Sequence, residues 1–205
     1  ESINNPKKYY KANVIATLNI LNACKNIRIK KFIYSASASC YGNPKELPIK
    51  EEAKIQTLSP YASTKWISET MVLRLAKTQR FPAISLRLFN VYGPRSRVSG
   101  PYSAVMSIFA KQKLANKPLT VAGDGLQSRS FIYVSDVVKV MIQAAKSKVF
   151  NEIFNVGSQR SIKINEIVKI FKGKSIYIPK RVGDPKYSSA NIKKITKQLN
   201  WKSKI

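Results

Sequence analysis

The stretch "KKFIYSASASCYG", residues 30–42, joins an apolar segment to a run of small and hydroxylated residues. Its first half is predicted to be a short buried strand, because apolar and aromatic residues cluster there between polar flanks. A helical pattern precedes it, with Val14, Leu18, Leu21 and Ile27 on the helical period. A helix that leads directly into a buried strand is typical of parallel α/β proteins.

The alternation of strands and helices continues along the whole chain. Ser59 and Pro60 supply an N-cap and a first-turn proline for a helix over 61–79. We expect further strands at 81–93, 118–125, 152–158 and 174–181, a strand or loop entering a helix over 128–148, and helices at 103–117, 161–171 and 188–201. This order predicts an α/β fold built on a parallel sheet.

The charge balance is strongly basic, with 37 Lys and Arg against 10 Asp and Glu and a net charge of +27. Such an excess suggests nucleic acid or an anionic surface as a partner. The basic residues are nevertheless scattered, without an arginine-rich tract, a zinc finger or an aromatic ribonucleoprotein motif. We therefore expect a solvated basic surface and no specific nucleic-acid binding.

The two cysteines, Cys24 and Cys40, form neither a metal motif nor a disulfide framework. We expect reduced thiols, no metal site and a cytoplasmic location. No apolar run approaches the roughly 20 residues needed to cross a bilayer, and no signal peptide opens the sequence, so we expect no membrane segment. The 205 residues suit one globular domain, alone or with a small appendage.

Ser37, Tyr61 and Lys65 are the candidates for reactive chemistry. Tyr61 and Lys65 are four residues apart and share one helix face. A phenol is a poor base at neutral pH, but a neighbouring ammonium favours its phenolate, which can accept a proton from a hydroxyl. Ser37 ends a predicted strand, where open α/β sheets bind their ligands. Each residue also has an ordinary alternative, as a chance spacing or a turn serine.

Six segments follow one another along the chain: "YYKANVIATLNILNACKNIRIKKFIYSASASCYG", "SPYASTKWISE", "LRLFNVYGPR", "GDGLQSRSFIYVSDVV", "FNVG" and "RVGDPKYSSANIKKITKQLNW". Together they resemble successive blocks of the extended short-chain dehydrogenase/reductase family, in its NAD-dependent epimerase/dehydratase branch. The similarity is greatest to nucleotide-sugar epimerases of the UDP-glucose 4-epimerase type. It covers almost the whole chain in the same order.

The resemblance implies NAD as cofactor and a nucleotide-sugar as substrate. The implied catalytic residues are Ser37, Tyr61 and Lys65. The implied NAD-binding residues are Asn13, Ser35, Tyr61, Lys65 and Phe89. The implied substrate-binding residues are Ser37, Asn90, Thr120, Val121, Arg129, Arg181, Asp184 and Ser188. The chemistry agrees, because guanidinium groups suit phosphate oxygens and a carboxylate accepts hydrogen bonds from ribose hydroxyls.

The same resemblance implies a Rossmann-like, doubly wound parallel sheet, lacking its N-terminal strands, and a smaller C-terminal substrate-binding domain. Residues 1–92 would be the C-terminal part of the NAD-binding domain. Residues 93–205 would mainly bind the nucleotide-sugar, with segments around 131–157 returning to the Rossmann domain. Because "GDGLQS", residues 123–128, is not a G-x-G-x-x-G loop, we expect a fragment that binds NAD poorly and is inactive alone. Ser130 replaces a usual aspartate, and Asp136 is close to it in sequence.

The implied reaction is epimerisation at carbon 4 of UDP-glucose, UDP-galactose or their N-acetyl forms, through a transient 4-keto intermediate. The family's 4,6-dehydratases carry an acid–base pair of Asp and Glu where this chain has Ala38 and Ser39, so dehydration is disfavoured. Decarboxylation stays open, because those members share the tyrosine and lysine. Ser188 replaces a tyrosine typical of glucose-restricted members, which predicts tolerance of N-acetylhexosamines.

Two further expectations concern partners. The resemblance implies a homodimer formed through the helix that carries Tyr61 and the helix before Ser37. The alternative from another class is a basic, non-catalytic nucleic-acid-binding protein, which would have no use for Ser37, Tyr61 and Lys65 together.

Overall fold

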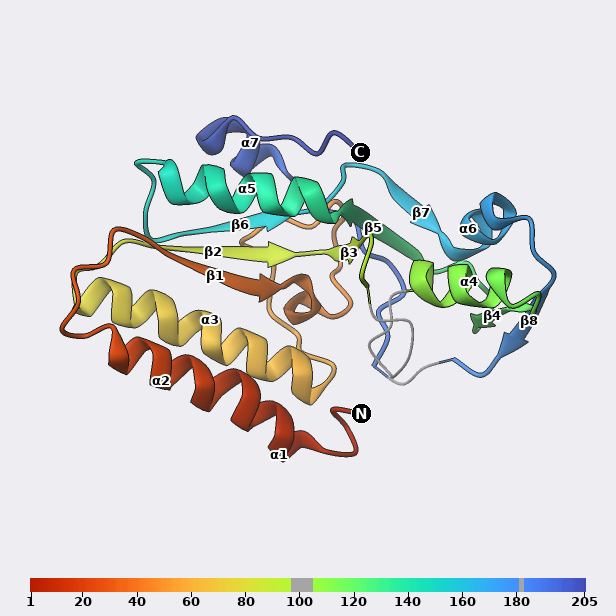
Figure 1. Ribbon diagram of the computed structural model, residues 1–205, viewed down its shortest axis with the longest axis horizontal. Coiled ribbons are helices and arrows are strands. Elements are labelled where there is room, and N and C mark those ends of the chain that lie inside the picture. The colour runs from red at the N-terminus through yellow and green to blue at the C-terminus, as the bar shows by residue number, and fades with distance from the viewer. Residues whose placement is uncertain (97–104, 181–182) are drawn as a thin grey trace.

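The computed structural model describes residues 1–96, 105–180 and 183–205. Its centre is a parallel sheet in the order β1-β2-β6 (Figure 1). The strands are β1 (Phe32–Ser37), β2 (Ala83–Leu88) and β6 (Glu152–Val156). The register runs from Phe32 opposite Ala83 to Ser37 opposite Leu88. The prediction of an α/β fold with a parallel sheet is confirmed.

Helices cover both faces of this sheet (Figure 1). On one face lie α3 (Pro60–Thr78) and a first helical segment made of α1 (Pro6–Tyr9), the π-helical η1 (Tyr10–Ile15) and α2 (Ala16–Ala23). On the other face lie α5 (Val134–Lys146) and α7 (Lys193–Leu199). The arrangement is that of a doubly wound sheet, as the sequence predicted.

A smaller group of elements, here called the small lobe, lies beyond the carboxyl ends of the central strands (Figure 1). Its strands are β3 (Asn90–Tyr92), β4 (Leu119–Ala122), β5 (Ser128–Tyr133), β7 (Ser161–Lys163) and β8 (Ser175–Ile178). Its helices are α4 (Val105–Leu114) and α6 (Ile164–Phe171). β3 and β5 are parallel, β7 is antiparallel to β5, and β4 and β8 form a separate parallel pair.

The strand predicted at 81–93 is in fact two strands that belong to different sheets. β2 pairs with β6, whereas β3 pairs with β5 in the small lobe. Phe89 separates them, and its N–H donates to the carbonyl of Val156 at 2.9 Å. The chain therefore passes from the central sheet to the small lobe at Phe89.

Three apolar clusters hold these layers together. The largest packs the central sheet against α5 and α7 and includes Phe154, Ile195 and Trp201. A second lies between the sheet and the α2–α3 face and includes Leu21, Tyr34 and Val72. A third, around Phe109 and Ile167, fills the small lobe. Among the described residues, no helix is long and apolar enough to cross a bilayer.

Candidate functional site

Ser37 and Tyr61 lie at the same end of the central sheet. Ser37 is the last residue of β1, and a short 3₁₀ helix, η2 (Ala38–Tyr41), follows it. Tyr61 is the second residue of α3, which packs against both β1 and η2. α3 begins at the edge toward which β1 points (Figure 1). Strand end and helix start thus bring the two hydroxyl groups to one edge, where parallel sheets bind ligands.

The start of α3 is set by its own sequence. Ser59 is the N-cap, and its Oγ accepts a hydrogen bond from the N–H of Ala62 at 3.3 Å. Pro60 occupies the first turn, where a missing N–H has no consequence. The predicted N-cap and first-turn proline are confirmed, and they fix where Tyr61 and Lys65 stand along the helix.

The Ser37 hydroxyl is engaged as an acceptor. Its Oγ accepts hydrogen bonds from the Ser39 N–H at 3.2 Å and from the Ser39 hydroxyl at 2.9 Å. A serine hydroxyl has two lone pairs and one proton, so these bonds occupy both acceptor positions. The Ser37 proton is left to donate to a ligand.

Lys65 lies on the sheet-facing side of α3, one turn after Tyr61. Its ammonium is 4.7 Å from the centroid of the Tyr34 ring, which belongs to β1. Burial lowers the pKa of Lys65, and the nearby Glu69 carboxylate partly opposes this. The Tyr61 ring in turn meets the Tyr9 ring edge to face, with centroids 6.2 Å apart.

Asn13 connects the first helical segment to α3. Its Nδ2 donates to Thr64 Oγ1 at 2.9 Å, and its carbonyl accepts from the Ser68 hydroxyl at 3.1 Å. Asn13 lies in the π-helical η1, which the sequence did not predict. Thr64 directly precedes Lys65 along α3. Asn13 therefore supports the helix that carries Tyr61 and Lys65 and makes no direct bond to either among the described contacts.

The other predicted cofactor-side residues differ in exposure. Ser35 is exposed on β1, whose outer edge is unpaired among the described strands. Phe89 is buried between β2 and β3, and its ring lies tilted against Tyr41 with centroids 6.5 Å apart. Asn90 begins β3 and donates from Nδ2 to the carbonyl of Ser130 at 3.1 Å.

Arg129 and Asp184, predicted as separate contacts for the nucleotide, bind each other. Arg129 Nη2 donates to Asp184 Oδ1 at 2.6 Å, and Nη1 donates to the carbonyl of Ser128 at 2.8 Å. The Arg129 side chain is 9% exposed and that of Asp184 is 33% exposed. The pair is therefore enclosed on the arginine side and open on the carboxylate side.

The remaining predicted nucleotide contacts also lie in or beside the small lobe. Thr120 and Val121 belong to β4, where the Thr120 N–H donates to Gln112 Oε1 at 3.1 Å and Val121 is buried. Ser188 is buried beside β5, and its N–H donates to the carbonyl of Ser128 at 3.1 Å. Arg181 lies outside the described residues.

The segment that carries Asp184 passes beside the start of α3. A Cβ on Gly183 would lie 2.9 Å from the carbonyl oxygen of Leu58 and 3.9 Å from Ser59 Cβ. Gly183 also has a φ of +77°, which side chains rarely adopt. Only a glycine permits this close approach. The segment that carries Asp184 therefore passes beside Leu58 and Ser59, which directly precede α3.

A buried polar network behind these residues was missed by the sequence analysis. Arg87 of β2 donates to both carboxylate oxygens of Glu69 in α3, at 3.1 and 3.0 Å from Nε and 2.5 Å from Nη2. Its Nη1 donates to the Tyr41 hydroxyl at 2.8 Å, which donates to Asn155 Oδ1 at 2.7 Å. Burial opposes the Arg87 charge, but Glu69, Tyr41 and Cys40 together outweigh it and the pKa of Arg87 is raised.

A signal for this network existed in the sequence. Arg87 is a charged residue inside the apolar strand "AISLRL", and a charge there requires a buried partner. Glu69 stands on the same helix face as Tyr61 and Lys65, two turns and one turn further on. The pair clamps α3 to the sheet directly behind the candidate site.

Asp136 does not take the place of the usual aspartate at Ser130. The Ser130 hydroxyl donates to the carbonyl of Ser158 at 2.8 Å. Asp136 instead accepts from the N–H groups of Lys204 and Ile205, at 2.8 and 3.0 Å. Among the described contacts, Asp136 therefore makes no hydrogen bond with Ser130 in spite of being close to it in sequence.

The profile of the NAD dependent epimerase/dehydratase family matches residues 1–157. A putative UDP-glucose 4-epimerase of Methanocaldococcus jannaschii is 35% identical over 211 residues, which cover 100% of this chain and 68% of that protein.

Two solved structures share the fold. The UDP-glucose 4-epimerase of Thermotoga maritima with UDP-glucose has a TM-score of 0.95 at 31% identity, covering 100% of this chain and 68% of that one. The UDP-N-acetylglucosamine 4-epimerase of Methanobrevibacter ruminantium, in complex with UDP-N-acetylmuramic acid, has a TM-score of 0.92 at 33% identity, covering 98% and 66%. The chain thus spans about two thirds of the length of these relatives.

Proposed function

Because the chain belongs to the NAD dependent epimerase/dehydratase family, we propose that it epimerises a nucleotide-sugar at carbon 4 through a transient 4-keto sugar. One observation carries the proposal. Ser37 ends β1 and Tyr61 begins α3 at the same edge of the sheet, with Lys65 one turn further along the helix. This set of groups can move a proton to and from a sugar hydroxyl.

Each of the three residues has a distinct task. Tyr61 accepts the proton of the hydroxyl on carbon 4, and the Lys65 ammonium favours the phenolate that does so. Ser37 donates a hydrogen bond to the same sugar oxygen, because its acceptor positions are filled by Ser39. NAD, when bound, would supply the hydride chemistry at carbon 4, and the three side chains would hold and move the proton.

The residues of this edge fit the nicotinamide end of NAD. Lys65 is a partly buried cation with no carboxylate within 4.0 Å among the described residues, so its ammonium is free to bind ribose hydroxyls. Ser35 is exposed on β1, and Phe89 is buried where β2 passes into β3. We assign residues 1–92, with segments around 131–157, to the cofactor-binding part and most of 93–205 to the nucleotide-sugar.

The nucleotide diphosphate is proposed to bind beside Arg129 and Asp184. Both groups meet at the rim of the small lobe, and the open carboxylate of Asp184 can turn toward ribose hydroxyls while Arg129 meets phosphate. Ser188 is buried and small, which supports room for an N-acetyl group. Ser188→Tyr should then reduce turnover of UDP-N-acetylglucosamine more than that of UDP-glucose.

Epimerisation is preferred over the other reactions of the family. Ala38 has no proton to exchange, and the Ser39 hydroxyl is committed to Ser37. Dehydration would need an acid and a base at these two positions. Decarboxylation of a UDP-glucuronate would use the same Tyr61 and Lys65, so release of carbon dioxide from that substrate is the outcome that would favour it.

The activity is tested in a chimera that joins residues 1–205 to the part of the M. jannaschii relative that this chain does not cover. We expect UDP-glucose and UDP-galactose to interconvert and the Tyr61→Phe variant to lose activity by roughly 10²- to 10⁴-fold. Full activity in that variant would remove Tyr61 as the base. Retention on heparin without any turnover would instead favour a basic binding protein.

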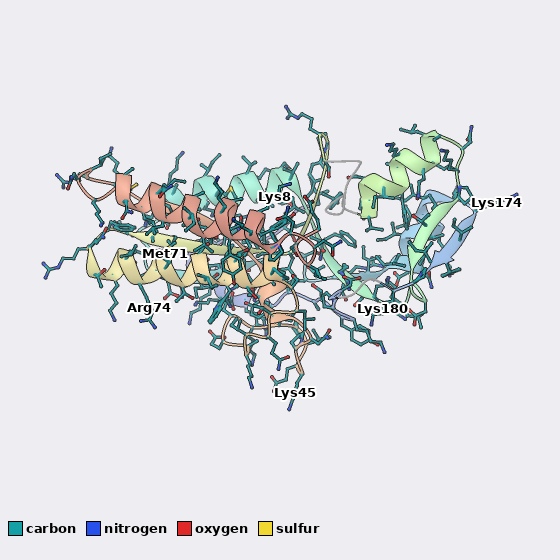
Figure 2. The ribbon with its side chains drawn as sticks, turned by 90° about the horizontal axis from the view of Figure 1, so that it is seen from below. Lys8, Lys45, Met71, Arg74, Lys174 and Lys180 are labelled. Carbon is teal, nitrogen blue, oxygen red and sulfur yellow. The ribbon has the colours of Figure 1, made fainter. Side chains whose placement is uncertain are left out.

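A homodimer is the assembly that we propose. An apolar groove of about 510 Å³ runs along α2 and α3, lined by Leu18, Trp66, Ile67, Thr70, Met71, Arg74 and Leu75. Figure 2 looks onto these two helices, which lie side by side, and labels Met71 and Arg74 on α3. A second copy would cover this face. Sedimentation of Trp66→Glu at the monomer mass, with the parent at twice that mass, would support it.

The cellular location is proposed from the thiols. Cys24 and Cys40 are both free, and Cys40 is buried. Unpaired cysteines suit a reducing compartment such as the cytoplasm.

A further inference from the structure

Among the described residues, the Lys65 ammonium lies over an aromatic ring and pairs with no carboxylate. Its Nζ lies 4.7 Å from the centroid of the Tyr34 ring, within the range of a cation–π contact. Burial lowers the pKa of Lys65, because desolvation disfavours the charged form. A group that stabilises the ammonium would offset part of this effect.

Glu69, one helical turn after Lys65, is not that partner. Its Oε2 accepts from the Ser85 hydroxyl at 2.8 Å, and its Oε1 accepts from Arg87 Nη2 at 2.5 Å. The carboxylate is thus neutralised by a buried guanidinium on the far side. What remains for Lys65 is a residual attraction across one helical turn, which opposes the burial effect only in part.

Tyr34 is placed to supply its ring face. It belongs to β1, is 8% exposed, and packs with Leu21 and Val72 between the sheet and the α2–α3 face. Its hydroxyl makes no hydrogen bond among the described residues. Burial raises the pKa of Tyr34, and the nearby hydroxyls of Ser68 and Thr17 offset this only partly, so the phenol stays protonated at neutral pH.

We propose that Tyr34 is a positioning residue that acts through Lys65, its ring face holding the ammonium beside Tyr61. Among the described residues, the Tyr34 ring on β1 and the Glu69 carboxylate on α3 act on Lys65, and Tyr61 lies one turn before it on the same helix. The quadrupole of the ring replaces part of the hydration that burial removes. The inference rests on the proposed function for its meaning, because a charged Lys65 is what favours the phenolate of Tyr61.

The test measures Lys65 directly in chain 1–205, without cofactor or substrate. Lysine is labelled with ¹³C at Cε, and the Lys65 signal is assigned by its loss in Lys65→Arg. In the parent, ring current should shift the Lys65 Hε protons upfield. In Tyr34→Leu we expect that shift to vanish and the proton affinity of Lys65 to fall by roughly three- to tenfold.

Three variants separate the ring from other causes. Tyr34→Phe keeps the ring and removes only an unbonded hydroxyl, so both readouts should stay as in the parent. Tyr187→Leu is the matched control, because Tyr187 lies under Lys186 at 5.3 Å on the exposed surface, where water screens the contact. That change should leave both Lys65 readouts as in the parent. If Tyr34→Leu does not fold, 3,4,5-trifluorophenylalanine at position 34 weakens the quadrupole at nearly constant shape.

The outcomes are unambiguous. A lowered proton affinity in the Leu or trifluoro variant, with a parent-like Phe variant, supports the proposal. An unchanged Lys65 titration in the Tyr34→Leu or the trifluoro variant, or a Tyr34→Phe variant that behaves like Tyr34→Leu, overturns it. Since no turnover is measured, an inactive chimera would contradict the proposed function and leave this result standing.

Discussion

Two arginine–carboxylate pairs, one in each half of the molecule, differ in how completely the protein encloses them. Arg87 and Glu69 are 4% and 3% exposed in their side chains, whereas Arg129 and Asp184 are 9% and 33% exposed. All three guanidinium nitrogens of Arg87 donate to protein groups. The Arg129 bonds among the described contacts involve Nη1 and Nη2.

The difference indicates two uses of the same chemistry. A pair that is dry and fully hydrogen-bonded cannot exchange partners without a large penalty, so Arg87 and Glu69 act as a fixed support for α3. A pair with one partner in contact with water can open at little cost. Arg129 and Asp184 are therefore suited to rearrange around a ligand.

The largest expected effect comes from breaking the enclosed pair. Arg87→Met leaves the Glu69 carboxylate buried without its cation and removes a donor to Tyr41. We expect the free energy of unfolding to fall by about 3–5 kcal/mol, measured by urea denaturation. Adding Glu69→Leu to Arg87→Met should restore much of the loss, because an apolar pair leaves no unpaired charge. A double variant as unstable as the sum of the singles would argue against a pairwise origin.

Replacing the arginine of the small-lobe pair by methionine tests the contrast between the two pairs. Arg129→Met should lower the free energy of unfolding by only about 1 kcal/mol, because water can solvate the freed Asp184 carboxylate. Its main effect should be on ligand binding. Calorimetry with UDP should show an affinity at least about tenfold weaker than that of the parent, as expected for a lost hydrogen bond between charged groups. Equal stability losses in Arg87→Met and Arg129→Met would abolish the distinction.

Sequence reasoning was most successful where the causes are local. The start of α3 depends on Ser59, Pro60 and Ala62, which are neighbours along the chain, and the N-cap was predicted correctly. The parallel sheet followed from the order of strands and helices. Ser37 and Tyr61 were brought to one sheet edge because both stand at element ends, which sequence patterns locate well.

Long-range pairings were beyond the same reasoning. Arg129 and Asp184 are 55 residues apart, and no local pattern shows that they meet. The break at Phe89 depends on β6 and β5, which take β2 and β3 as partners in separate sheets. The tyrosine under Lys65 was likewise hidden, because the period of a strand shows which face Tyr34 occupies but not which helix residue lies above it.

Glu51 is an intermediate case, because it is a buried carboxylate without a paired cation. Its replacement should change the free energy of unfolding least among the substitutions considered. It is buried like Glu69, and its Oε1 accepts from the Asn155 N–H at 2.9 Å, but among the described contacts it has no ion-pair partner. Burial raises the pKa of Glu51 above the ordinary 4.5, while the Asn155 N–H lowers it in part. The native state thus binds this proton more tightly than the unfolded state does.

The sign of the pH dependence follows from that difference. The Glu51 contribution to the free energy of unfolding falls as the pH rises from 4.5 through the raised pKa and is constant above it. Glu51→Gln mimics the protonated form, so it should match the parent near pH 4.5 and exceed it by up to about 1 kcal/mol at pH 7, measured by urea denaturation. The exposed neighbour supplies a graded comparison, since the Glu52 charge contributes to the raised pKa of Glu51 and Glu52→Gln should make the pH profile only slightly shallower. A Glu51→Gln variant less stable than the parent at pH 7 would show that the charge itself is needed, and Glu51 would then belong with the enclosed pair.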